Sequence, residues 1–110
     1  MANDQKIPIS LEDKRLTLHS LLTTLIDEGS VHYQPDSNVR LTYPCITYMF
    51  DKPVHSYANN IKFISFYRFT ITLITDDATD PLYDILQELF TFENQYVLDG
   101  LYHSVFITNI

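Results

Sequence analysis

The sequence predicts a single α+β domain in which two helices pack on one face of an antiparallel four-stranded sheet, in the order α-β-β-α-β-β. Two segments carry apolar residues at three- and four-residue spacing behind a capping residue, which is typical of amphipathic helices. Two pairs of segments are rich in β-branched and aromatic residues, which favours hairpins. The chain has 110 residues, the size of one domain with one core.

The composition excludes several classes of protein. Hydrophobic residues make up 45% and aromatic residues 14%, too much for a disordered chain. Fourteen acids against seven Lys and Arg give a formal charge of -7, which disfavours non-specific binding to nucleic acid. Apolar runs are far shorter than the roughly 18 residues that span a bilayer. No signal peptide is readable and the single cysteine has no disulfide partner, so we expect synthesis in the cytoplasm and no membrane insertion.

The first helix is expected from Leu11 to about Glu28. Ser10 precedes it as the N-cap, and Asp13 stands at the third helical position as a weak capping box. Residues 1–10 are expected to form an N-terminal arm, either flexible or ordered by a partner. The apolar stripe comprises Leu18, Leu21, Leu22, Leu25 and Ile26, and the residues expected to face water are Lys14, Arg15 and Asp27.

The first hairpin is expected to be unusually long. Gly29 to Leu41 has no sustained period and is read as a loop, while Pro44 to Phe50 and Ile61 to Thr75 alternate as strands. The connection Asp51 to Asn60 must then project beyond the sheet. The longer strand also outruns its partner, and an unpaired length of strand either needs protection or receives another chain. The core-facing residues of the longer strand are expected to be Phe63, Tyr67, Phe69, Ile71 and Leu73.

The second helix and the second hairpin follow. Pro81 suits a first helical position behind Asp80 or Thr79, and the apolar stripe predicts a helix that ends near Phe92. Gln95 to Leu98 and Leu101 to Thr108 are β-prone and are separated by Asp99-Gly100, a strong signal for a tight hairpin turn. Both helical stripes are expected on one face of the sheet, which leaves the other face partly polar and aromatic and free for partners.

The candidate catalytic residues do not form a site. The segment "VLDGLYHSVFI" places Asp99 and His103 four positions apart, but the hairpin turn between them gives them no reason to meet. Cys45 lies within a strand without a basic neighbour in sequence, so it is expected to be a small core residue. With two glycines in the chain, no phosphate-binding loop is expected. We therefore expect no catalytic residue and no enzyme activity.

The candidate metal ligands are equally scattered. His19, His32 and His55 lie on a helix and two loops without zinc-ligand spacing. The acids between Asp76 and Asp84 lack the order of a calcium loop and are explained by the N-terminus of the second helix. We expect neither a metal nor a cofactor.

Tyrosine is more abundant than a small core requires. A core accounts for about half of the tyrosines with their hydroxyls satisfied, and the residue type is enriched at protein interfaces. The excess therefore predicts protein contacts. The eight tyrosines are at positions 33, 43, 48, 57, 67, 83, 96 and 102.

Three stretches of the chain carry a resemblance to a known family. They are Tyr43-Pro44-Cys45-Ile46-Thr47-Tyr48, then Ala58-Asn59-Asn60 before a long aromatic strand, then Leu98-Asp99-Gly100-Leu101-Tyr102-His103-Ser104-Val105-Phe106. In this order, with the Asp-Pro helix start between them, the chain resembles the small neck proteins of long-tailed bacteriophages, the tail-completion or tail-terminator group that joins head to tail. The likeness covers about residues 11–110.

The resemblance implies a structural role in the virion. It implies an α+β fold, a hexameric ring at the top of the tail tube, contacts with the tail-tube protein and with the head-connector or stopper protein, no catalytic residues, and assembly in the host bacterial cytoplasm. A ring needs a heterologous contact between copies. The residues expected at this or another partner interface are Tyr33, Tyr43, Tyr57, Asn59, Asn60 and Arg68.

The acid excess has two readings. If copies surround a channel through which DNA passes, acids lining it would repel phosphate and keep the DNA from binding. The alternative function is a small acidic DNA mimic or host-factor inhibitor of phage origin. A mimic should set carboxylates in rows at phosphate-like spacing, whereas the acids here fall mostly at expected caps and turns.

Overall fold

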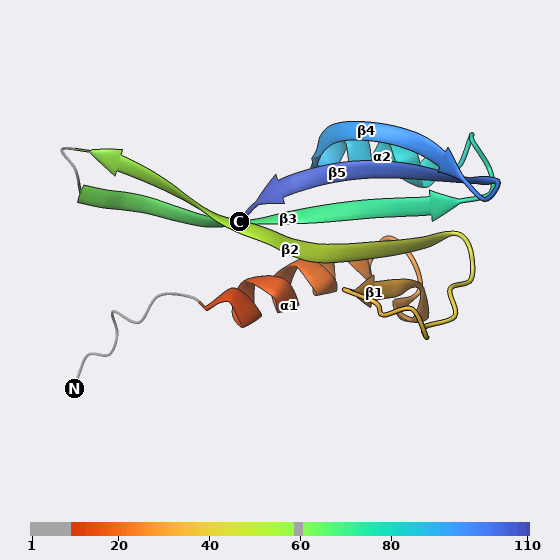
Figure 1. Ribbon diagram of the computed structural model, residues 1–110, viewed down its shortest axis with the longest axis horizontal. Coiled ribbons are helices and arrows are strands. Elements are labelled where there is room, and N and C mark those ends of the chain that lie inside the picture. The colour runs from red at the N-terminus through yellow and green to blue at the C-terminus, as the bar shows by residue number, and fades with distance from the viewer. Residues whose placement is uncertain (1–9, 59–60) are drawn as a thin grey trace.

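The fold is built on a mixed five-stranded sheet with two helices. The computed structural model describes residues 10–58 and 61–110 of a single α+β domain (Figure 1). The strand order is β1-β2-β3-β5-β4, with β1 parallel to β2 and every other neighbouring pair antiparallel. The elements are α1 (Leu11–Leu22), η2 (Glu28–Ser30), β1 (Val31–Tyr33), β2 (Cys45–Ala58), β3 (Ile61–Thr75), α2 (Pro81–Leu89), β4 (Thr91–Leu98) and β5 (Leu101–Asn109).

The prediction of four antiparallel strands was wrong because it missed β1. This strand lies within the segment that was expected to be a loop, and it pairs in parallel with β2, Val31 opposite Ile46 and Tyr33 opposite Tyr48. Three residues are too few to establish a period, and the short turn η2 precedes them directly. The loop therefore begins only after Tyr33.

The first helix is shorter than expected. Its N-cap is confirmed, because Ser10 Oγ accepts a hydrogen bond from the Asp13 N–H at 3.1 Å. The helix ends at Leu22, where the Thr23 and Thr24 hydroxyls donate to the Ser20 and Leu21 carbonyls at 2.9 and 2.6 Å. Side chains that bond to nearby carbonyls compete with the helical pattern, so the chain turns here instead of continuing to Glu28.

One hydrophobic core joins the two helices to alternate residues of the sheet. Leu18 and Leu22 of α1 meet Leu82 and Leu86 of α2 in a single buried cluster. The sheet contributes one side chain in every two along its central strands, as an alternating pattern requires. These sheet residues are Ile46, Tyr48, Phe69, Ile71, Leu73 and Phe106.

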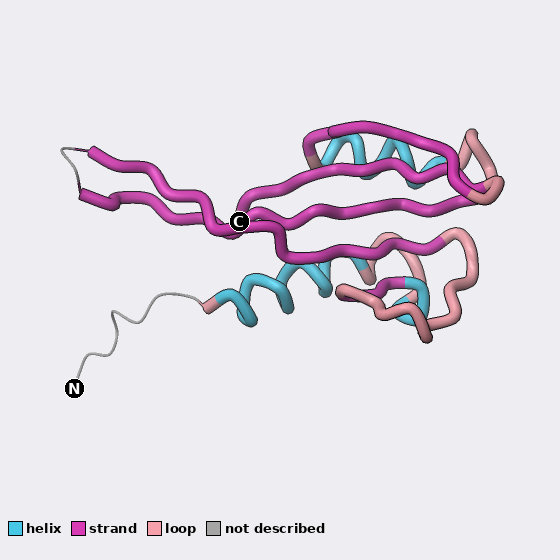
Figure 2. The backbone as a smooth tube through the Cα atoms, in the orientation of Figure 1, coloured by secondary structure: helices cyan, strands magenta, loops and turns pink. Residues whose placement is uncertain are grey.

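The expected projection exists, but it is made of strand and not of loop. β2 runs through residues 51–58 and stays paired with β3 as far as Ala58 opposite Ile61, with register shifts after Phe50 and Ser56. The sequence shows no alternation here because the ribbon has no core to face. The last contacts of β3 with β5 and the C-terminal residue lie at Arg68, opposite Asn109, and at Tyr67, which bonds to Ile110. Beyond them, β2 and β3 extend from the body as a two-stranded ribbon, which we call the arm, residues 53–66 (Figure 2).

The second hairpin forms around the predicted turn. Asp99 and Gly100 have φ of 54° and 76°, so both central positions are left-handed as a type I′ turn requires. The Asp80 cap and Pro81 start of α2 are also confirmed, since Asp80 Oδ1 accepts from the Leu82 N–H at 2.9 Å. However, α2 ends at Leu89 and β4 begins at Thr91, because Phe92 pairs with Phe106 of β5.

Truncation of Leu86 to alanine should cost about 2–5 kcal/mol of the free energy of unfolding, because its fully buried side chain leaves a cavity. Leu89→Ala on the same helix is the matched control, since Leu89 is 47% exposed and should lose less than about 1 kcal/mol. Urea unfolding of both variants followed by circular dichroism measures the difference. Equal losses in the two variants would show that the core does not lie where we describe it.

Candidate functional site

The six residues predicted as an interface are separated in the structure. Three lie on strands: Tyr33 on β1, Tyr57 near the far end of β2 within the arm, and Arg68 on β3 where the arm meets the body. Tyr43 precedes β2 and is 41% exposed. Asn59 and Asn60 lie outside the described residues. Of the described members of this set only Tyr57 lies on the arm, so no single described surface collects them.

Tyr33 is held within the protein. Its ring lies 5.0 Å from the ring of Tyr48, measured between centroids, and the Arg15 guanidinium lies 4.9 Å from its centroid. A cation over an aromatic face is attracted by the ring. This contact ties the first helix to β1 and leaves Tyr33 half-buried.

A polar network under the first helix was missed from the sequence. The buried Tyr48 hydroxyl accepts a hydrogen bond from Arg15 Nη1 at 3.3 Å and is bonded to His19 Nδ1 at 2.7 Å. Arg15 also donates to both carboxylate oxygens of Glu12, at 3.0 and 2.7 Å. Arg15 was expected to face water, and that expectation was wrong. The helical spacing of Glu12, Arg15 and His19 is the signal that could have placed all three on one face.

The network has the electrostatics of a structural contact. Burial raises the pKa of Tyr48, and the hydrogen bond from Arg15 lowers the pKa of the exposed Glu12 carboxylate. The hydrogen bond to Glu12 likewise raises the pKa of Arg15. These shifts keep Tyr48 neutral and the pair of Glu12 and Arg15 charged at neutral pH, so the groups bind one another and do not exchange protons.

The histidine and cysteine weighed from the sequence have structural surroundings. His103 stacks on Tyr96 with ring centroids 4.7 Å apart, and its Nδ1 lies 3.2 Å from the Leu101 carbonyl. Cys45 is fully buried, and burial raises the pKa of its thiol to about 11. A thiol that stays protonated at neutral pH is a poor nucleophile.

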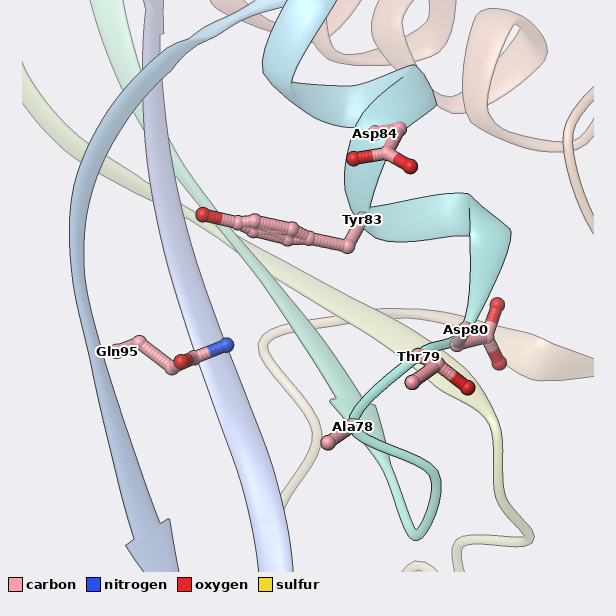
Figure 3. A pocket seen from close by; sticks show the side chains of 6 residues that line it. All are labelled: Ala78, Thr79, Asp80, Tyr83, Asp84 and Gln95. Carbon is pink, nitrogen blue, oxygen red and sulfur yellow. The ribbon is translucent and has the colours of Figure 1, made fainter.

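An open hollow of about 380 Å³ lies between the start of α2 and β4. Figure 3 shows Tyr83 reaching from α2 toward the strands and Gln95 approaching from β4. Two acids, Asp80 in the hollow and Asp77 beside it, form hydrogen bonds with nearby residues. Asp80 caps α2 and accepts from Thr75 Oγ1 at 3.3 Å, and Thr79 N–H and Oγ1 bind the Asp77 carboxylate and lower its pKa. The hollow therefore reflects helix capping and offers no convergent set of free polar groups.

Two kinds of feature, a metal site and a membrane-spanning helix, are absent from the described part of the chain. Within it, no three or more His, Cys, Asp or Glu side chains gather closely enough to hold a metal ion. Neither described helix has the length and apolar character needed to cross a bilayer. The absence of a cofactor stays a prediction.

Sequence reasoning predicted the second half of β4, Gln95 to Leu98, but missed its start at Thr91 and its exposure. Every residue from Thr91 to Leu98 is solvent-exposed, although β5 covers one side of the strand. Val97 is 61% exposed and Leu98 55% exposed. On the helix beside it, Ile85 and Leu89 are exposed as well. We call the outer side of β4 the β4 edge. An exposed apolar edge strand is a ready site for pairing with another chain.

Charge is distributed unevenly between the arm and the β4 edge. Residues 52–68 contain three basic side chains, Lys52, Lys62 and Arg68, and no acid. Residues 69–110 contain no Lys or Arg and seven acids, Asp76, Asp77, Asp80, Asp84, Glu88, Glu93 and Asp99. The arm itself contains Lys62, with Lys52 and Arg68 at its base, while the β4 edge contains Glu93.

Neither the protein-family models nor the curated proteins compared with this chain give a match.

Replacing Tyr48 by phenylalanine should cost about 1 kcal/mol of unfolding free energy, because Arg15 and His19 lose a hydrogen-bond partner. Tyr33→Phe is the control. It keeps the stacked ring and removes a hydroxyl that has no hydrogen bond in the described part of the chain. Chemical denaturation should find this control within about 0.5 kcal/mol of the parent. A larger loss in Tyr33→Phe than in Tyr48→Phe would contradict the network.

Stability should fall above pH 9 through Cys45. The thiol pKa is 9.0 in the unfolded chain and about 11 in the fold, so the fold binds the proton more tightly. This contribution is complete below pH 9 and is lost as the pH rises to 11. The parent should lose about 1–3 kcal/mol more than Cys45→Ala between pH 8 and 11, measured by urea unfolding. Identical pH dependence of the two proteins would refute the buried thiol.

Proposed function

We propose that this chain is a non-enzymatic structural subunit of a long-tailed bacteriophage neck, a tail-terminator or tail-completion protein that forms a ring, caps the tail tube and docks to the head connector. The observation that carries the proposal is the presence of two unpaired sheet edges in one small chain. One is the β4 edge, an outer strand of the sheet, and the other is the arm, where β2 and β3 run past their neighbours β1 and β5. Exposed edges in natural proteins are either blunted or used for assembly.

The usual protections are sparse at these edges. β4 is eight residues long and carries one charged side chain, Glu93, without any Lys or Pro. The arm contains Pro53 at its base, where the strand passes beyond the body. A long edge with exposed apolar side chains and little charge favours association over a solitary particle.

A ring can form if the arm of one copy binds the β4 edge of the next copy, which is a heterologous contact. Such a contact joins one patch to a different patch on the next copy, and it closes when the rotation between copies divides a full turn. The arm and the β4 edge differ in position and in charge. The resemblance to neck proteins adds the expected ring size, a hexamer.

The negative charge suits a passage for DNA. A ring of copies multiplies the net charge of -7, and a negative lumen would repel phosphate during passage. DNA would then move through without specific binding. The ring would act in the virion neck after assembly in the cytoplasm of the host bacterium.

The local use of carboxylates favours this role over a DNA mimic. Asp36 accepts from the Asn38 N–H at 2.9 Å, Asp77 and Asp80 hold the start of α2, and Glu12 pairs with Arg15. These groups stabilise turns and helix ends at separate places in the chain. A mimic requires carboxylates in free rows, so the ring subunit is the function we propose.

The ring is tested by native mass spectrometry and light scattering over protein concentrations from about 1 μM to 1 mM. We expect a monomer at the low end and a discrete assembly of hexamer mass at the high end, because the edge contacts are individually weak and closure makes them cooperative. A monomer at every concentration would sink the proposal. So would an open series of growing aggregates, which is what a contact without closure gives.

A further inference from the structure

We infer that the arm of one copy pairs with the β4 edge of the next copy, adding strand to strand across the subunit boundary. This inference rests on the proposed ring and names the contact that builds it. The arm and the β4 edge are both short of a strand neighbour, so each supplies what the other lacks. Main-chain hydrogen bonds of this kind provide affinity, while the flanking side chains decide the partner.

The arm is a two-stranded ribbon without a third described strand beside it. Its strands pair from Val54 opposite Phe66 to Ala58 opposite Ile61. The body ends where Tyr67 and Ile110 exchange hydrogen bonds at 2.8 and 3.0 Å. Phe66, just beyond that point, is 40% exposed. An isolated two-stranded ribbon is marginally stable in water, and packing against another strand stabilises it.

The β4 edge presents its main chain to a partner in a defined register. The type I′ turn makes Leu98 and Leu101 a hydrogen-bonded pair, so Tyr96 and His103 form the next such pair. The N–H and C=O groups of Gln95 and Val97 therefore point away from β5. These outward groups are the ones that a neighbouring strand would bind.

Charge selects this pairing over the alternatives. Contact between two arms would bring together Lys62 and the Lys52 and Arg68 at the base of each arm, and contact between two β4 edges would bring together two copies of Glu93. Lys52 and Arg68 already face each other across the ribbon, and like charges directly opposite destabilise a strand pair. Glu93, the third residue of β4, would relieve that repulsion if its carboxylate lay beside them. Complementary charge also fixes which edges meet.

Two variants separate the two halves of the contact. Val97→Pro removes an outward N–H from the β4 edge and keeps the bonds to β5, and Val97→Ala is its control with the N–H intact. The second variant lacks most of the arm, residues 55–65 being replaced by Asn-Gly to close the hairpin beside Val54 and Phe66, which face each other across the ribbon one pair beyond Pro53 and Tyr67. Circular dichroism and the urea midpoint establish that each variant folds.

Mixing the two variants is the decisive step. Each should be monomeric alone at concentrations where the parent assembles, because each lacks one half of the contact. A one-to-one mixture at about 1 mM should give a heterodimer and nothing larger, since the arm of the Val97→Pro copy meets the intact β4 edge of the armless copy but a single contact lacks the cooperativity of ring closure. Native mass spectrometry resolves the two masses, and Val97→Ala should assemble like the parent.

Charge reversal tests the same contact without altering the backbone. The double variant Lys52→Glu with Lys62→Glu should raise the concentration for half assembly at least tenfold, and adding Glu93→Lys should recover part of the loss. Arg40→Glu makes the same kind of change on an exposed loop away from both edges and should leave that concentration unchanged.

The outcomes distinguish this contact from the proposed ring. Assembly that survives both Val97→Pro and loss of the arm overturns the contact and leaves the ring proposal standing. Folded variants that stay monomeric when mixed also overturn the contact. A parent that stops at a dimer, with heterodimers still formed on mixing, keeps the contact and overturns the ring. A parent that never associates overturns both.

Discussion

The structure depends on the pairing of β2 with β3, which continues well past the end of the hydrophobic core. Within the body, Ile46, Tyr48 and Phe50 face Leu73, Ile71 and Phe69 across the ladder. The buried members of these pairs hold both helices through one cluster. Beyond the register shift after Phe50, the same ladder carries the chain away from the body without apolar support. The arm exists because the pairing of β2 with β3 continues beyond the hydrophobic core.

The two ends of the sheet are consequently unlike each other. The arm is a ribbon without a third described strand and carries Lys62, while β4 is paired with β5 along its length and carries Glu93. Their difference makes self-pairing of like edges unfavourable and pairing of unlike edges favourable. The buried polar groups, by contrast, are satisfied within the fold: Tyr48 by Arg15 and His19, and Ser104 by Gln95 Nε2 at 2.8 Å. The proposed assembly therefore rests on the exposed strand edges and not on the buried polar groups.

Local signals in the sequence predicted the parts of the fold that local physics decides. The Ser10 cap, the Asp80-Pro81 start and the Asp99-Gly100 turn each rest on contacts between neighbouring residues, and each is present. The alternation from Phe69 to Leu73 correctly predicted the core face of β3, because every second residue of this stretch is buried.

The missed features depend on contacts far along the chain. β1 forms because β2 offers it a parallel partner, which no pattern of three residues reveals. Residues 51–58 form a strand because they pair with β3 beyond the body, and Arg15 turns inward because Tyr48, thirty-three positions away, receives it. The candidate interface was predicted on tyrosines and on the arm. The β4 edge was missed because its apolar residues were taken as half of an ordinary covered hairpin.

Hydrogen exchange of individual amides tests the central claim, that the outer side of β4 is covered by a strand of another copy, most directly. In dilute monomer, the inward amides of Tyr96 and Leu98 should be protected and the outward amides of Gln95 and Val97 should exchange freely. On assembly, Gln95 and Val97 should become protected together with the arm, while Tyr96 and Leu98 change little. Free exchange of Gln95 and Val97 in the assembled protein would contradict the account.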